Sequence, residues 1–166
     1  ITKNKKLIKI FIKAKKQKIA LEIKDINIYN LLASLAVIKE CSLNLNETKN
    51  IFKNYEPTEG RGKIHLISRY NKKFKLIDES YNANPLSVKS AISSFDAIKK
   101  KNSKKYLILG DMLELGRKSE KYHRDLSKVI NNSNIDKVFI KGEKTLFTYK
   151  NLHKSKQGNI LQNKDD

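Results

Sequence analysis

Cysteine, long apolar runs and a secretory signal are scarce or missing in this sequence of 166 residues. The single cysteine, Cys41, excludes an intramolecular disulfide and a metal cage of several cysteines. The three histidines, His65, His123 and His153, are too scattered for a zinc motif. No apolar run approaches the roughly 18 to 20 residues that span a bilayer, and the first residues, ITKNKK, lack a secretory pattern. We therefore expect a cytoplasmic protein without membrane insertion.

Glycine patterns that bind nucleotide phosphates are also missing. A P-loop requires G-x-x-x-x-G-K-[ST], and Gly142-Glu143-Lys144-Thr145 lacks the earlier glycine of that pattern. No G-x-G-x-x-G is present either, so an independent nucleotidase or dehydrogenase is not expected. The first residue is Ile1 and the only methionine is Met112. We therefore expect a piece of a longer protein, whose function would belong to the parent.

Basic residues, in contrast, are abundant. Lysine and arginine number 36 against 17 acidic residues, which gives a formal net charge of +19. Such a charge allows a lysine-rich nucleic-acid-binding domain, and this is the alternative function that we keep. However, the lysine clusters at 13–18 and 99–105 are not interleaved with the aromatic residues on which single strands stack. A solvated lysine surface is the usual explanation of such charge runs and is preferred here, so no specific nucleic-acid partner is expected.

Hydrophobic patterns predict a hairpin and two helices in the first third of the chain. The runs 7–12 and 19–23 are short, apolar and joined by a polar connection, as in two paired strands. From 27 to about 40, apolar residues recur at helical spacing. A second helix is predicted at about 47–55, with Asn46 as its N-cap.

The segment PTEGRG then interrupts these patterns. Gly60 and Gly62 indicate a turn or hinge, so we predict a domain boundary near 57–62. Beyond it, 64–68 and 74–78 are predicted to form another hairpin.

The remainder alternates between helices and strands. A helix is predicted from Pro85 with Asn84 as its cap, and its buried stripe would comprise Val88, Ala91, Ile92, Phe95 and Ile98.

Three further strands and two helices complete the pattern. The apolar run 106–109 is typical of a strand covered on both faces. Helices at 119–131 and 143–150 and strands at 137–140 and 159–161 follow. This alternation predicts an α/β fold with a mostly parallel, Rossmann-like sheet.

Two polar segments follow predicted strands: 78–85, DESYNANP, and 110–116, GDMLELG. Ligands of open α/β sheets bind at the carboxyl ends of strands, so both segments could serve one ligand. The alternative is purely structural, with Asn84 and Ser119 capping helices and the glycines turning the chain.

These two segments, separated by a helix and a strand, resemble the signature of the C-terminal domain of the Mur ligases. They are most similar to the branch that adds D-alanyl-D-alanine to UDP-N-acetylmuramoyl-tripeptide. Upstream, Asn27-Ile28-Tyr29-Asn30 followed by LLASLA resembles a helix of the family's central ATPase domain, although Ile26 replaces the usual histidine. Gly60-Arg61-Gly62 resembles the family's hinge. The resemblance covers roughly residues 20–150.

The resemblance implies a domain organisation. Residues 1–57 would be the C-terminal part of the central, ATP-binding domain, a strand-helix tail. Residues 58–166 would be the Rossmann-like C-terminal domain, truncated at its end. Because the P-loop and the metal ligands of the central domain are missing, we expect the fragment alone to be inactive. The ligase is expected to be a monomer.

The resemblance also implies an activity. These ligases phosphorylate a carboxylate with ATP, and an amine attacks the resulting acyl phosphate. ATP and Mg²⁺ would be the cofactors, with Mg²⁺ held by the missing part of the parent. Arg61 would act catalytically and contact the phosphates, a task suited to a planar guanidinium. Asn27 and Asn30 would contact adenine, and Asp78 would bind the ribose hydroxyls.

For the dipeptide substrate, the resemblance implies contacts from the two polar segments and the helix after them: Asn82, Asn84, Asp111, Glu114 and His123. Structural alternatives stay open for several of these residues. His123 could equally be a surface or packing histidine, because an imidazole needs a located partner before a role can be argued. Asn27 and Asn30 could be ordinary capping or surface amides.

Overall fold

The structure, a computed structural model, describes residues 8–14, 17–23, 27–52, 55–99 and 102–162. The chain divides into two compact units, Ile1–Thr58 and Glu59–Asp166, which are described separately below. Within the described residues, no helix has both the length and the apolar character required to cross a bilayer.

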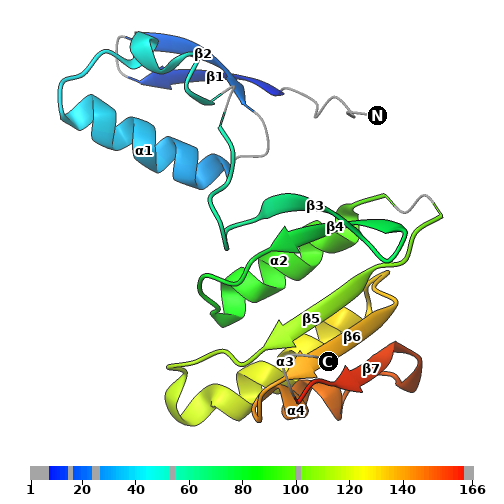
Figure 1. Cartoon of the computed structure of the whole chain (residues 1–166). Helices are drawn as coiled ribbons and strands as arrows, with labels where there is room; N and C mark the ends of the chain where they lie inside the picture. The colour runs from blue at the N-terminus through cyan, green and yellow to red at the C-terminus, as the bar shows by residue number, and fades with distance from the viewer. Residues whose placement is uncertain (1–7, 15–16, 24–26, 53–54, 100–101, 163–166) are drawn as a thin grey trace. The chain divides into compact units, whose positions relative to one another are not determined.

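The first unit is a hairpin with one helix (Figure 1). Strands β1 (Ile8–Ala14) and β2 (Gln17–Ile23) pair antiparallel, which confirms the predicted hairpin and extends both strands into the polar connection. Helix α1 (Ile28–Glu40) follows, also as predicted. The core of this unit is formed by apolar side chains of β2, α1 and the segment after α1: Ile19, Leu21, Ile23, Leu31, Leu35 and Leu45.

The prediction of a second helix in this unit, at about 47–55, is wrong. The described residues of 47–55 form no α-helix, and the chain instead forms a 3-10 turn, η1 (Leu45–Thr48), capped by Asn44 rather than Asn46. The Thr48 hydroxyl donates to the Leu45 carbonyl at 2.7 Å. Such local side-chain hydrogen bonds compete with a continuing α-helix. Part of the predicted helix, residues 53–54, lies outside the described residues.

The second unit begins with the other predicted hairpin, which is confirmed. Strands β3 (Lys63–Arg69) and β4 (Lys72–Asp78) pair antiparallel around a two-residue turn. Both turn residues, Tyr70 and Asn71, have positive φ angles of 51° and 56°. Two such residues match the right-handed twist of the strands they join.

A parallel three-stranded sheet in the order β5-β6-β7 follows, and the α/β fold class is confirmed. Strands β3 and β4, the predicted hairpin, form a separate two-stranded antiparallel sheet. The remaining elements of the unit are α2 (Pro85–Ala97), β5 (Tyr106–Gly110), η3 (Gly116–Lys118), α3 (Ser119–Asn131), β6 (Lys137–Lys141), α4 (Thr145–Tyr149), η4 (Lys154–Lys156) and β7 (Gln157–Ile160).

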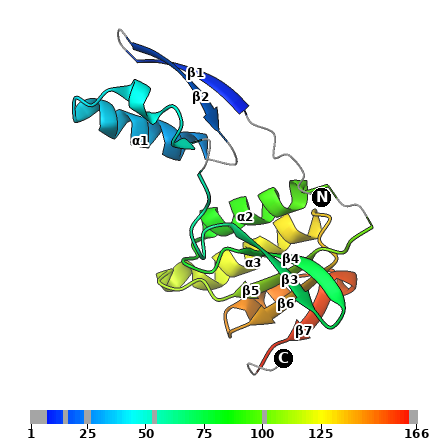
Figure 2. The ribbon, with the colours of Figure 1, turned by 45° about the horizontal axis from the view of Figure 1, so that its top comes forward.

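Helix α3 packs against α2 (Figure 2) and also against α4, and the core lies between these helices and one face of the sheet. The buried core residues are Ile92, Leu109, Met112, Leu126, Ile130, Ile135, Val138, Ile140 and Leu152. Of the stripe predicted for α2, Ile92 is buried and Val88, Ala91 and Phe95 are partly buried, whereas Ile98 follows the helix and is exposed.

The prediction that 106–109 is covered on both faces is wrong. Along β5 burial alternates, with Leu109 only 6% exposed and Ile108 65% exposed. The helices cover the face that carries Leu109. On the opposite face, Tyr106 contacts Phe139 edge-to-face at 6.0 Å between ring centroids. A continuous apolar run therefore does not establish burial on both sides.

Candidate functional site

The carboxyl ends of β4 and β5 lie on the same side of the second unit, at the left in Figure 1. We call the segments that follow these strands the β4 loop (78–84) and the β5 loop (110–116). Together with Arg61, they contain most of the predicted site residues, and each loop is built differently.

The β4 loop is joined to the predicted hinge. The backbone N–H of Gly62 donates to the Asp78 carbonyl at 2.7 Å, and that of Tyr81 donates to the Gly60 carbonyl at 3.1 Å. Gly60 has a φ of 71°, and a Cβ at this position would lie 2.7 Å from the Cβ of Tyr81. Only glycine permits both this backbone conformation and this close approach.

This pairing places Arg61 beside the β4 loop. Its guanidinium lies 4.2 Å from the centre of the Tyr81 ring, a cation-π contact. The contact orients the guanidinium, which is exposed and permanently charged. Its N–H donors lie in the plane of the guanidinium. Sequence reasoning missed Tyr81, although it stands in the middle of the DESYNANP motif.

Asp78 is held by both neighbouring segments. Its Oδ2 accepts from the Gly60 N–H and its Oδ1 accepts from the Ser80 N–H, each at 3.0 Å. Hydrogen bonds from Ser80, then from Gly60, together with the nearby His65, hold the pKa of Asp78 below its usual value. Asp78 is therefore an ionised acceptor at neutral pH, oriented by two backbone donors.

The two predicted asparagines of the β4 loop differ in their contacts. The Asn84 side-chain oxygen accepts from the backbone of Leu86 and Ser87 at 3.0 and 2.9 Å, and Ser87 completes a capping box. The structural alternative for Asn84, a helix cap, is thus confirmed. The group that Asn84 can still offer a ligand is its side-chain NH₂. The exposed Asn82 accepts only locally, from the Ala83 N–H at 2.8 Å.

The β5 loop is anchored by Asp111. This carboxylate accepts from the backbone N–H groups of Thr145 at 2.8 Å and Lys144 at 3.2 Å, at the start of α4. Asp111 therefore ties the β5 loop to the segment after β6. Its carboxylate still has lone pairs for a ligand, since two oxygens provide about four acceptor positions.

His123 provides the second anchor. The imidazole is fully buried, with 0% of the residue exposed. Its Nε2 lies 3.0 Å from the Met112 N–H, and its Nδ1 lies 2.8 Å from the Ser119 carbonyl. These partners require Nε2 to accept and Nδ1 to donate, a tautomer assigned from the hydrogen bonds. Both ring nitrogens are thus engaged within the protein, which agrees with the packing alternative for His123, and the substrate contact stays a prediction.

Glu114 stands at the outer part of the β5 loop. Glu114 is exposed and has a φ of 59°, an uncommon conformation for a non-glycine residue. The adjacent Leu113 is 73% exposed. The structure therefore presents this part of the loop to solvent, with Met112 buried beneath it.

Asn27 and Asn30 belong to the other unit. Asn27 caps α1, with its side-chain oxygen accepting from the N–H groups of Tyr29 at 2.9 Å and Asn30 at 3.3 Å. The capping alternative is thus confirmed for Asn27. Both side chains lie on the first turn of the helix and are exposed.

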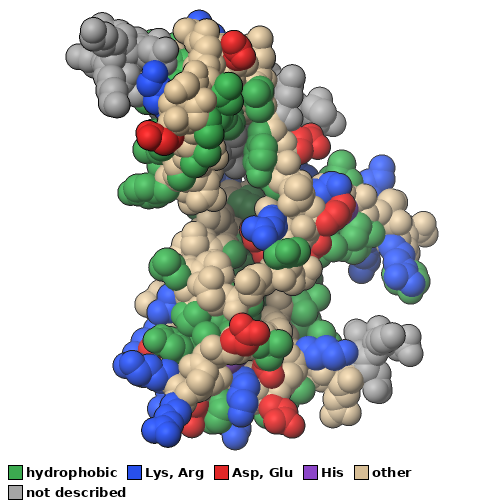
Figure 3. Space-filling view, turned by 90° about the vertical axis from the view of Figure 1, so that its left-hand side faces the viewer, with side chains coloured by type: hydrophobic (Ala, Val, Ile, Leu, Met, Phe, Trp, Pro, Cys, Tyr) green, Lys and Arg blue, Asp and Glu red, His purple; other side chains and the backbone are tan. Residues whose placement is uncertain are grey.

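Charge on the side that carries the loops is mixed. Figure 3 faces this side and shows lysine, arginine and acidic side chains interspersed, without a continuous basic stripe in that view. The alternative of a nucleic-acid-binding domain gains no support here, because such binding relies on clustered cations.

A match to a known protein family covers both loops. Residues 61–159 match the family described as "Mur ligase, glutamate ligase domain". A UDP-N-acetylmuramoyl-tripeptide–D-alanyl-D-alanine ligase of Bacillus subtilis is 36% identical over 94 residues, which is 54% of this chain and 20% of that protein. The enzyme of the same name from Buchnera aphidicola of Acyrthosiphon pisum is 33% identical over 124 residues, covering 70% of this chain and 24% of that protein.

Solved structures share the fold. A structure of MurF from Acinetobacter baumannii matches 93% of this chain and 34% of its own, with a TM-score of 0.73 and 19% identity. MurF from Thermotoga maritima, solved in complex with ADP, matches 95% of this chain and 34% of its own, with a TM-score of 0.70 and 20% identity. The chain thus spans about a fifth to a quarter of the length of these curated relatives and about a third of the solved chains.

Proposed function

Since this chain belongs to the Mur ligase family, we propose that it is part of an ATP-dependent ligase that joins D-alanyl-D-alanine to UDP-N-acetylmuramoyl-tripeptide. The reaction is a cytoplasmic step in the synthesis of peptidoglycan precursors. Residues 1–57 belong to the central ATP-binding domain of a monomeric parent, and residues 58–166 belong to its C-terminal domain.

The observation that carries this proposal is the joining of the hinge to the β4 loop. Hydrogen bonds between Gly60, Gly62, Asp78 and Tyr81 bring a permanently charged guanidinium and an oriented carboxylate onto neighbouring segments. A nucleotide has the complementary pair of groups, since its phosphates attract a guanidinium and its ribose hydroxyls donate to a carboxylate.

In this proposal ATP supplies the phosphoryl group that activates the carboxyl substrate. Arg61 binds the phosphates and neutralises the charge that develops during transfer. Asp78 accepts from the ribose hydroxyls, and Asn27 and Asn30 offer side-chain amides to adenine. Mg²⁺ accompanies the nucleotide and is held by parts of the parent outside this chain.

The dipeptide binds at the two loops. Asp111 and Glu114 offer carboxylates to its ammonium group, and Asn82 and Asn84 offer side-chain amides. The two anchors of the β5 loop, Asp111 and His123, support this role, because substrate alignment requires loops held within a fraction of an ångström.

The test is a chimera in which residues 59–161 replace the matching segment of the Bacillus subtilis relative. We expect release of ADP that depends on D-alanyl-D-alanine, and a loss of at least about 100-fold in rate for Arg61→Ala, as when a transition-state charge contact is removed. Arg69→Ala is the matched control, because Arg69 also stacks on a tyrosine, Tyr70, at 5.0 Å. A folded chimera without dipeptide-dependent ADP release would contradict the proposal, as would equal rates for the two variants.

A further inference from the structure

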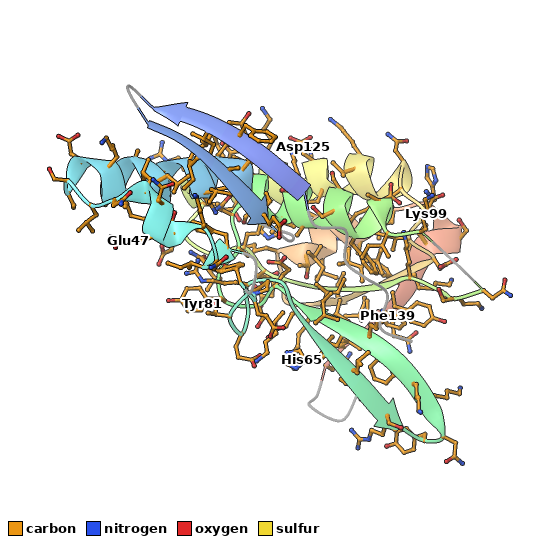
Figure 4. The ribbon with its side chains drawn as sticks, turned by 90° about the horizontal axis from the view of Figure 1, so that it is seen from above. Glu47, His65, Tyr81, Lys99, Asp125 and Phe139 are labelled. Atoms are coloured by element: carbon orange, nitrogen blue, oxygen red, sulfur yellow. The ribbon has the colours of Figure 1, made fainter. Side chains whose placement is uncertain are left out.

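Three side chains with metal-binding atoms meet at the base of the β3–β4 hairpin. Glu59, His65 and Asp78 each offer one nitrogen or oxygen atom, and these atoms all lie within 4.8 Å of one another. Figure 4 labels His65 near the base of the hairpin, away from its turn. The proposed ligase chemistry uses Asp78 but leaves Glu59 and His65 without a role.

The strand register explains why these groups converge. Lys63 pairs with Asp78, and His65 pairs with Leu76. Because side chains alternate between the faces of a hairpin, His65 and Asp78 lie on the same face as diagonal neighbours. Glu59 reaches this face from the turn before β3, where its Oε2 lies 3.0 Å from His65 Nε2.

The donor atoms can accept an ion without dismantling the surrounding contacts. Lys63 pairs with the other oxygen of Glu59, so Oε2 can bind an ion while that pair persists. Each oxygen of Asp78 accepts one backbone N–H, and a carboxylate oxygen has a further lone pair. The backbone bonds from Gly60 and Ser80 would then orient a metal-bound carboxylate, as supporting hydrogen bonds do in established sites.

The geometry points to a site for a divalent transition ion of the zinc type, bound by Glu59 Oε2, His65 Nε2 and a carboxylate oxygen of Asp78. One nitrogen and two oxygen ligands with water in the fourth position suit tetrahedral Zn²⁺. Ligand atoms around such an ion are about 3.3 Å apart, for bonds of about 2.0 to 2.1 Å. Side-chain rotations that shorten the longest separation by about 1.5 Å are therefore sufficient.

The ligand set separates this ion from the Mg²⁺ that accompanies a nucleotide. Mg²⁺ prefers oxygen ligands in an octahedral arrangement and keeps several waters, so an imidazole disfavours it. The two carboxylates balance the charge of the dication, and the ion takes the place of the proton between Glu59 and His65. Asp78 is shared with the proposed ligase site, whereas Glu59 and His65 are not, so ion binding can be measured in the absence of a nucleotide.

The test is calorimetric titration of the 166-residue chain with Zn²⁺, in a Cys41→Ser background that removes the exposed thiol. We expect one ion per chain, and an affinity lowered at least about tenfold by His65→Gln. The control is His153→Gln, because His153 is exposed and lies outside the cluster. Millimolar Mg²⁺ should leave the Zn²⁺ affinity unchanged.

Glu59→Gln provides a second variant at an exposed position, in case His65→Gln disturbs the hairpin. Far-UV circular dichroism of the metal-free variants checks that they are folded. Failure to bind Zn²⁺ at millimolar concentration would overturn the inference. The same holds if Glu59→Gln binds as tightly as the parent chain, or if His153→Gln weakens binding as much as His65→Gln. None of these results bears on ADP release by the chimera.

Discussion

The β4 loop and the β5 loop follow strands of the same unit, yet they are held in different ways. The β4 loop is fixed by short-range contacts and by the hinge, and its side chains remain exposed or partly exposed. The β5 loop is fixed from below by the buried His123 and from the side through Asp111. The β5 loop therefore depends on the core of the unit, whereas the β4 loop depends on the backbone beside it.

The largest expected effect comes from the buried anchor. His123→Ala removes a fully buried ring and leaves the Met112 N–H without its acceptor, so we expect the free energy of unfolding of the second unit to fall by about 3 kcal/mol. Urea unfolding followed by circular dichroism measures this loss, and amide exchange at Met112 should accelerate with it. His153→Ala, at an exposed position, should change stability by less than about 0.5 kcal/mol. Similar losses for both variants would refute the assigned anchor.

Asp111 should have an intermediate effect. Asp111→Ala removes the acceptor of two N–H groups at the start of α4, so we expect a loss of about 1 to 2 kcal/mol. Faster amide exchange at Thr145 would locate the change. The exposed Glu143 is the control, and Glu143→Ala should be close to neutral. If Thr145 exchange is unaffected by Asp111→Ala, the anchor contributes nothing measurable.

Within the β4 loop, alanine substitutions of the two asparagines should have different effects on stability. Asn84→Ala removes the cap of α2 and should cost about 1 kcal/mol. Asn82→Ala should cost less than about 0.5 kcal/mol, because Asn82 is exposed and accepts only from its neighbour. Thermal unfolding of the two variants compares them directly, and the reverse order would contradict the capping assignment.

The smallest effect concerns pH. The pKa of Asp78 is lowered by its hydrogen bonds in the folded chain, so its contribution to stability is present above the unfolded value and is lost as pH falls through the folded value. Asp78→Asn should therefore destabilise the unit near neutral pH and have a weaker effect below about pH 4. Urea titrations at both pH values test this. An equal loss of stability at both would exclude the ionised carboxylate of Asp78 as the source of the stabilisation.

Much of the fold could be predicted where local patterns agree with tertiary contacts. Both hairpins follow from short apolar runs around polar turns, and α1 and α2 begin at the asparagines that cap them. The helix expected at 47–55 was wrong because Leu45 is buried and Thr48 bonds back to its carbonyl. The full burial expected for 106–109 was wrong because only one face of β5 meets the helices.

The candidate site was predictable in its composition but not in its contacts. The motifs identified both loops and Arg61, since strand ends are where ligands bind. Nothing in the sequence indicates that Tyr81 lies under Arg61 or that Glu59 meets His65, because these contacts depend on how 60–62 pairs with the β4 loop. The contacts of His123 could not be predicted either, because its position near the motif does not reveal which way the ring faces.

One consequence of the β5 anchor concerns Gly142, in the turn before α4. Gly142 has a φ of 118°, and a Cβ there would overlap the carboxylate of Asp111. The carboxylate thus occupies the volume that a side chain at 142 would need. These two positions behave as one mutational unit: evolution or an engineer can enlarge the residue at 142 only by moving or shortening the side chain at 111, and with it the tether between two strands.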